Sequence, residues 1–231
     1  MIYSVMSAYF ISVLFLFIPW LLFFLLRPDL RRKMISLSVK GSIAGPISQF
    51  WYLTDYWIPF KIFTLEELII DLLFAAFAFS LTGIIYNIFF KMKSIPIKKV
   101  PRTHFYKCLL IAIIILIGCL VIFTNILGIN SIYSSAIGFL ILTSIIWFER
   151  RDLIKVSIIG SIILTIITFI GYRMILIIWP NFIHEFWLLE NISGLLIFDI
   201  PIEEFIWFST WGLVGVLLYE WFNYYKFKKI L

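Results

Sequence analysis

The sequence of 231 residues is 63% hydrophobic and 14% charged, with a mean hydropathy of +1.06. Soluble domains are about 45–50% apolar, so this composition excludes a soluble globular protein. It predicts an all-α integral membrane protein with a single membrane domain over residues 1–231. The net charge of +6 could fit nucleic-acid binding. The charges are clustered between apolar segments, however, and we therefore expect the lipid bilayer as a partner and no nucleic acid.

Apolar segments long enough to cross a bilayer occupy residues 3–26, 66–90, 107–128, 130–148, 153–178 and 201–224. A seventh segment, residues 34–52, is less apolar because it contains Lys40, two glycines and a proline. If it also crosses, all four basic clusters fall on one side of the membrane, as the positive-inside rule favours. We therefore predict a bundle of seven transmembrane helices in the cytoplasmic membrane, with the N-terminus outside and the C-terminus in the cytoplasm.

The four clusters hold 16 of the 19 basic residues: Arg27, Arg31, Arg32, Lys33, Lys91, Lys93, Lys98, Lys99, Arg102, Lys107, Arg150, Arg151, Lys155, Lys226, Lys228 and Lys229. Nine of the 13 carboxylates fall at the opposite, outer face. Avoidance of positive charge outside explains the acids in loops. It does not explain Asp71 and Glu204, which lie inside helix ends, where an ionisable group indicates function.

Redox and metal chemistry have no recognisable motif in this sequence. The only cysteines, Cys108 and Cys119, lie in one apolar segment and are expected to be buried by packing. There is no glycine-rich dinucleotide fingerprint, no P-loop and no His/Cys spacing typical of a metal site. We therefore expect no cofactor and no metal.

Two short segments resemble each other. "QFWYLTD" (residues 49–55) and "EFWLLEN" (residues 185–191) share a Phe-Trp pair and a leucine at equal spacing. This alignment places Asp55 opposite Asn191. A shift by one residue places Asp55 opposite Glu190 instead, but it loses the Phe-Trp match.

Each of these segments leads into a long helix with a carboxylate near its start. The carboxylates are Asp71 and Glu204, and in both helices a tyrosine follows fifteen residues later. The sequence therefore predicts a parallel internal repeat, with units over residues 34–91 and 153–224. Functional sites tend to form between such halves of a membrane protein.

The paired carboxylates Glu203 and Glu204 follow Pro201, which favours the first turn of a helix. Adjacent helical residues point about 100° apart, so these two carboxyls face different surroundings. Such a pair suits a proton donor and a charged partner. Rings at helical spacing from Glu204 or Asp71 would stabilise a cation, and the alternative is ordinary helix packing. The candidate substrate-binding rings are Trp207, Phe208, Trp211, Phe74 and Phe79.

Arg173 lies in the apolar segment 153–178, at a similar depth to the carboxylates. It is expected either to pair with Glu203, Glu204 or Asp71, or to extend to the membrane interface. Further polar residues of the same outer layer, among them Asp55, Glu190 and Asn191, would form a supporting cap that orients the acids, or loose interfacial polarity.

The stretch "FWLLENISGLLIFDIPIEEFIWF", followed by "GVLLYEWF", resembles the C-terminal unit of the membrane-embedded lycopene cyclase domain family. That family has a Pro-x-Glu-Glu motif, matched here by Pro201, Ile202, Glu203 and Glu204. "WYLTDYWIP" and "LIIDLLFAAFAF" resemble the preceding unit, with Asp71 in the place of its acid. The first unit lacks a Pro-x-Glu-Glu motif. Members act as single chains, as pairs of chains or as fusions, so the oligomeric state is left open.

The resemblance implies cofactor-independent cyclisation of a lycopene-like polyene, an intramolecular lyase or isomerase reaction. An end group is protonated, the cation is attacked by a neighbouring alkene, and proton loss gives an ionone-type ring. Glu204 would be the acid or the cation stabiliser, and Glu203 its partner. Two alternatives remain: a hydratase acting on the same end groups, and a transporter or lipid-binding protein that uses the same acids.

Overall fold

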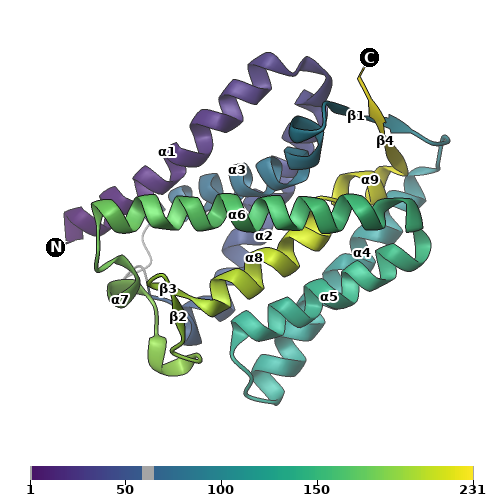
Figure 1. Cartoon of the computed structure of the whole chain (residues 1–231). Helices are drawn as coiled ribbons and strands as arrows, with labels where there is room; N and C mark the ends of the chain where they lie inside the picture. Colours follow the sequence, from purple (N-terminus) through teal and green to yellow (C-terminus); the bar gives the residue numbers. More distant parts are fainter. Residues whose placement is uncertain (1, 59–64, 231) are drawn as a thin grey trace.

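The computed structural model describes residues 2–58 and 65–230. Its elements in chain order are α1 (Ile2–Leu26), η1 (Pro28–Leu30), α2 (Arg31–Asp55), α3 (Leu65–Phe89), β1 (Met92–Pro96), α4 (Arg102–Cys119), η2 (Leu120–Ile126), α5 (Ser131–Glu149), η3 (Arg151–Leu153), α6 (Ile154–Ile178), α7 (Phe182–Phe186), η4 (Leu189–Asn191), β2 (Leu196–Ile197), β3 (Ile200–Pro201), α8 (Ile202–Gly215), α9 (Leu218–Asn223) and β4 (Tyr225–Lys229). The chain is thus predominantly helical, and a helix coincides with every apolar segment predicted from the sequence (Figure 1).

Five helical stretches of the described residues are long and apolar enough to cross a membrane: Glu67–Phe89, Arg102–Ile126, Ser131–Glu149, Arg151–Ile178 and Ile202–Asn223. α1 and α2 pass this test only together, across a bend of 107°. The chain therefore has the helices of a multi-pass membrane protein with five or six spans. The predicted count of seven is not confirmed, because α2 carries several charged residues and is not apolar enough alone.

α8 is the central helix of the bundle and packs against both α6 and α5 (Figure 1). Small residues allow the close approach of α6: a Cβ at Gly212 would lie 2.7 Å from the Cα of Ser161. Ser161 Oγ also donates to the Ser209 carbonyl at 2.6 Å, and Ser157 Oγ donates to the Leu213 carbonyl at 2.5 Å. These contacts fix α6 to α8 along the half of α8 remote from Glu204.

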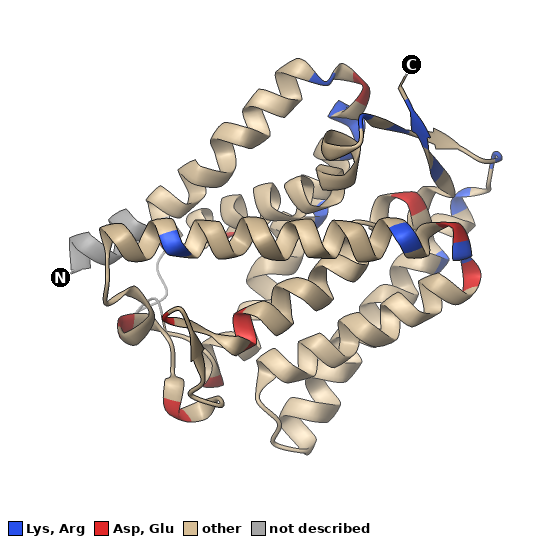
Figure 2. Cartoon of the chain, viewed as in Figure 1, with Lys and Arg blue, Asp and Glu red and all other residues tan. Residues whose placement is uncertain are grey.

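Charge separates the two ends of the bundle. Lysine and arginine gather around the ribbon of β1 and β4, the start of α4 and the turn between α5 and α6, which we call the basic end (Figure 2). Acidic residues lie around α7, β2 and β3 at the other end, which we call the acidic end (Figure 2). The hairpin of β2 and β3 pairs Leu196 with Pro201 and leads directly into α8.

At the basic end, the buried ammonium group of Lys33 joins the two halves of the chain. Lys33 Nζ donates to Glu220 Oε1 at 2.6 Å and to Asn87 Oδ1 at 2.9 Å. Ser94 Oγ donates to the same Glu220 oxygen at 2.5 Å. Lys33 is 2% exposed and Glu220 is fully buried, so each charge depends on the other for compensation.

Two corners at the basic end have the same construction. The sequence Arg-x-Asp-Leu occurs at 27–30 and at 150–153, and in each copy the arginine binds the aspartate through two nitrogens. In each copy the guanidinium also donates at 2.8 Å to a backbone carbonyl, that of Met92 in β1 or that of Tyr225 in β4. β1 and β4 then pair antiparallel, with Ser94 opposite Phe227 at the centre.

Candidate active site

The paired carboxylates lie at the first turn of α8, at the acidic end. Pro201 is the N-cap residue of this helix, and the hairpin of β2 and β3 fixes the direction in which α8 starts. Glu203 is fully buried and Glu204 is 6% exposed. Because they are adjacent in the helix, they face different neighbours. Glu203 faces α5 and the loop before β2, and Glu204 faces α6 and the segments that end α2 and α7.

Three protein donors surround the Glu204 carboxylate. The Tyr56 hydroxyl and Trp187 Nε1, the latter at 2.9 Å, both donate to Oε1. The Tyr172 hydroxyl donates to Oε2 at 2.6 Å. Both oxygens of this buried carboxylate are therefore hydrogen-bonded, as a negative charge developing on it inside an apolar bundle requires.

Glu203 is bound more asymmetrically. Its Oε1 accepts from the Tyr133 hydroxyl at 2.5 Å and from the Ser193 backbone N–H at 3.0 Å. Its buried Oε2 has no hydrogen-bond partner among the described residues. The two neighbouring carboxyls thus have clearly different surroundings, and Glu204, unlike Glu203, is among the residues that line a crevice between α6 and α8.

This crevice lies between α6 and α8. Its lining combines one carboxylate and one phenol with rings, aliphatic groups and hydroxyls: Thr165, Thr168, Phe169, Tyr172, Ile200, Glu204, Phe205 and Phe208. The free volume is about 10 Å³, close to what a single water molecule needs. The rings therefore close the crevice over Glu204 in this conformation.

The aromatic residues predicted along α8 separate into two groups. Phe208 lines the crevice, and its ring centroid is 6.4 Å from that of Tyr172. Trp207 and Trp211 instead face the bundle interior, where Trp207 Nε1 donates to the Tyr52 hydroxyl at 2.9 Å. Phe79 of α3 packs on Trp211 with ring centroids 4.4 Å apart. Phe74 of α3 is not among the residues that line the crevice.

Asp71 has a separate environment in α3. It is 4% exposed, and Gln49 Nε2 donates to its Oδ1 at 3.1 Å. A Cβ at Gly45 would lie 2.3 Å from the Cβ of Ala75, so α2 packs very closely on α3 beside Asp71. The Asp71 carboxylate is not part of the crevice at Glu204. The residue that donates a hydrogen bond to Asp71 is also different from those that donate to Glu204.

The predicted pairing of Arg173 with Glu203, Glu204 or Asp71 is wrong. Arg173 Nη1 donates to Asp199 Oδ2 at 3.2 Å and to the Phe198 carbonyl at 2.7 Å. Its side chain is 39% exposed. This position keeps the guanidinium at the edge of the bundle, where its charge is not desolvated, in agreement with the alternative expectation that it extends to the interface.

The other predicted supporting residues do not contact the paired carboxylates. Asp55 ends α2 and accepts from Ser131 Oγ at 2.5 Å and Ser131 N at 2.8 Å, so it holds the start of α5. The side chains of Glu190 and Asn191 are exposed in η4. The Asn191 backbone carbonyl accepts from Asn130 Nδ2 at 3.2 Å. The polar layer thus joins α2, α5 and η4, and it does not orient Glu204.

Sequence reasoning missed the donors to the carboxylates, Tyr56, Tyr133, Tyr172 and Trp187. Two of them had a weak signal: Trp187 belongs to the segment matched with "QFWYLTD", and Tyr56 directly follows that segment. In the structure the matched Phe-Trp pairs occupy different elements, because Trp51 lies inside α2 and Trp187 directly follows α7. Among residues 2–58 and 65–230, no group of three or more His, Cys, Asp or Glu is arranged to hold a metal ion.

Comparison with known proteins identifies one family. Residues 130–222 match the family model described as lycopene cyclase. No curated protein matches the sequence, and no solved structure matches the fold. The matched segment runs from the N-cap of α5 into α9 and contains both paired carboxylates with Tyr133, Tyr172 and Trp187. The match confirms the resemblance to the lycopene cyclase family for residues 130–222.

Proposed function

We propose that this protein is a carotenoid cyclase that closes rings at the ends of a lycopene-like polyene by proton transfer from Glu204. The observation that carries the proposal is the buried Glu204 carboxylate, which borders an apolar crevice and has three preset donors. Its place in a lycopene cyclase domain supports the choice of reaction. We propose that Glu204 is the acid and that Glu203 fixes the first turn of α8.

The proposed reaction conserves atoms and electrons. Glu204 gives its proton to the terminal alkene, and the tertiary cation that results is attacked by the neighbouring alkene to form the ring. The adjacent carbon then loses a proton to the Glu204 carboxylate, which restores the acid. Negative charge develops on Glu204 as the first proton leaves, and the Tyr56, Tyr172 and Trp187 donors stabilise that charge without reorganisation.

The rings of the crevice complete the proposed site. Phe169, Phe205 and Phe208 would present π faces to the cation and exclude the water that would otherwise capture it. Because the crevice is closed, an end group must separate these rings. Serine and glycine contacts fix α6 to α8 away from Glu204. We therefore propose that α6 and α8 separate at the acidic end, where the polyene enters from the lipid.

We further propose that the chain consists of two related units and lies with its basic end in the cytoplasm. Two observations support the duplication: the repeated Arg-x-Asp-Leu corners, and the antiparallel pairing of β1 with β4 about Ser94 and Phe227. Residue 94 is separated from residue 227 by the same interval as Asp71 from Glu204. The clustering of lysine and arginine at one end supports the orientation (Figure 2).

Deuterium labelling tests the proton-initiated reaction. Membranes that contain the protein are incubated with lycopene in D₂O, and the pigments are analysed by chromatography and mass spectrometry. The proposal predicts a cyclic product with one deuterium per ring, and a product of unchanged mass in H₂O. A product heavier by one water would identify a hydratase instead. A cyclic product without deuterium after a single turnover, in membranes equilibrated with D₂O before lycopene is added, would refute protonation by an exchangeable acid as the first step.

A further inference from the structure

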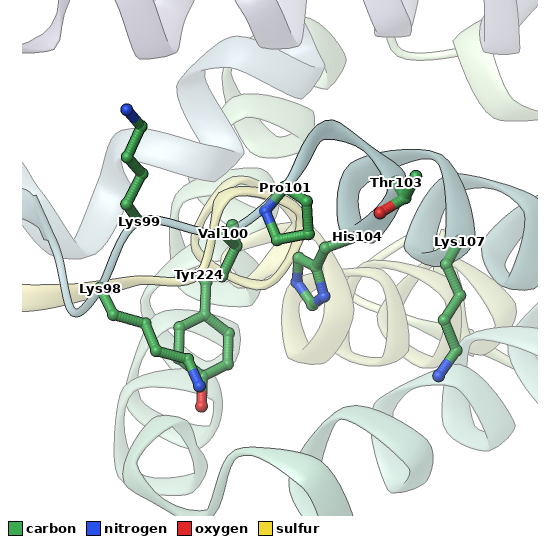
Figure 3. A pocket seen from close by; sticks show the side chains of 8 residues that line it. All are labelled: Lys98, Lys99, Val100, Pro101, Thr103, His104, Lys107 and Tyr224. Carbon is green, nitrogen blue, oxygen red and sulfur yellow. The ribbon is translucent and has the colours of Figure 1, made fainter.

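A hollow lies at the basic end, remote from Glu204. It has a volume of about 560 Å³ and is formed by the loop after β1, the first turns of α4 and the residue before β4. Its lining consists of Lys98, Lys99, Val100, Pro101, Thr103, His104, Lys107 and Tyr224 (Figure 3). Three of these eight residues are lysines, and none is acidic.

One lysine of this hollow lies against an aromatic ring. Lys98 Nζ lies 5.2 Å from the centroid of the Tyr224 ring, and Arg150 Cζ lies 5.0 Å from the same centroid. Figure 3 shows Lys98 extending across Tyr224 and Lys107 extending beside His104, whereas Lys99 extends away from them. The Tyr224 ring thus positions the ammonium group of Lys98, although all three lysines are exposed.

Backbone donors at the start of α4 add to the positive lining of the hollow. No side chain caps α4 at Pro101, so its first backbone N–H groups have no side-chain acceptor. His104 Nε2 lies 3.1 Å from the Trp221 carbonyl and donates to it, because a carbonyl only accepts, so this nitrogen is not available to a ligand. Arg150 contacts Tyr224 but does not line the hollow, and its Nη1 has no hydrogen-bond partner among the described residues. The three lysines and the start of α4 together favour an anion in the hollow.

The neighbouring acids do not line the hollow. Trp221 Nε1 donates to Glu149 Oε2 at 2.7 Å, and Asp152 compensates the charge of Arg150 by binding it through both oxygens. We propose that the hollow is a binding site for a phosphate group at the membrane surface, carried by an anionic phospholipid or by a soluble phosphate. The hollow adjoins the start of the Arg102–Ile126 span, where lipid headgroups lie. This inference is independent of the reaction at Glu204.

Native mass spectrometry of the purified protein in a neutral detergent tests the site. The protein is titrated with phosphatidylglycerol, phosphatidylcholine or inorganic pyrophosphate. The site variant is Lys98→Gln/Lys107→Gln, and the matched control is Lys228→Gln/Lys229→Gln in the exposed strand β4. Both variants remove two positive charges from the basic end, so overall charge is held constant between them. Melting temperatures in detergent establish that both variants fold.

The proposal predicts that phosphatidylglycerol or pyrophosphate binds more tightly than phosphatidylcholine. The site variant should weaken that binding about tenfold or more, and the β4 control should leave it nearly unchanged. Binding of phosphatidylglycerol alone would assign the site to a lipid, and binding of pyrophosphate would assign it to a soluble ligand. An equal loss in both variants, or no preference over phosphatidylcholine, would overturn the proposal.

Discussion

The Tyr172 hydroxyl donates a hydrogen bond of 2.6 Å to Glu204 Oε2, and both side chains border the crevice between α6 and α8. This contact joins the half of α6 near the acidic end to the first turn of α8, so it closes the same gap that a polyene end group would have to enter. It also places a phenol beside the acid. Tyr172 therefore connects the geometry of the helix pair to the chemistry of the carboxylate.

Replacing Tyr172 with phenylalanine should lower cyclase activity by about 10- to 100-fold, because one of the three donors to the developing carboxylate is lost. The ring that packs in the crevice stays, so folding should be preserved. Pigment conversion in lycopene-accumulating cells measures the effect, normalised to protein in the membrane. Tyr106→Phe is the matched control, since Tyr106 is 63% exposed on α4. Equal activity in both variants would remove Tyr172 from the mechanism.

The two buried acids of the predicted units should differ in function. Asp71→Asn should keep most of the activity, because Asp71 does not line the crevice at Glu204. Glu204→Gln should abolish it, since an amide cannot supply the proton. Both substitutions preserve size, and the comparison uses the same pigment assay. If Asp71→Asn alone were inactive while folded in the membrane, the assignment of the acid to Glu204 would be wrong.

Glu220→Gln should destabilise the protein by about 3–5 kcal/mol, because it leaves the buried Lys33 ammonium without its counter-charge. The pair is 2.6 Å apart and almost completely buried. Thermal unfolding in detergent measures the loss, with Glu190→Gln in the exposed η4 as control. The double variant Lys33→Met/Glu220→Gln should recover part of the stability. A double variant no more stable than Glu220→Gln would show that the ion pair is not the cause.

Gly212→Ala should destabilise the α6–α8 pair by about 1–3 kcal/mol, because the added Cβ would meet the Ser161 backbone at 2.7 Å. Gly171→Ala in α6 is the control, since a Cβ there meets nothing within 4 Å. Its melting temperature should be unchanged or slightly higher, because alanine favours the helix. A similar loss in both variants would show that the close approach of Gly212 to Ser161 is not the cause.

The parts of the site that sequence reasoning predicts are those formed by residues close together in the chain. Glu203 and Glu204 are adjacent, and the preceding proline places them in the first turn of a helix, so their contrasting surroundings could be expected. The donors to Glu204 lie 148, 32 and 17 residues away along the chain. Side-chain periodicity describes one helix at a time, and it carries no information on which helices pack together.

The same limit explains the differences in the fold. The six apolar segments form helices, because apolar composition over such lengths specifies helix in a membrane. The less apolar segment 34–52 is also helical, within α2. The bend of 107° between α1 and α2 depends on the Arg27–Asp29 corner and on the packing of α2 against α3. The depth of Arg173 allowed it either to pair with the acids or to extend to the interface, and its direction around α6 sends it to Asp199. The sequence thus predicts how far along a helix a side chain lies, whereas packing decides which way that side chain points.

The most direct measurement is expression of the wild-type protein and Glu204→Gln in cells that accumulate lycopene, followed by pigment analysis. The account predicts that the wild type gives a pigment of unchanged mass with altered retention and absorption. It predicts that Glu204→Gln, present in the membrane in equal amount, leaves lycopene unaltered. Cyclisation by both proteins, or unaltered lycopene with the wild type, would contradict the proposal that Glu204 protonates a carotenoid end group.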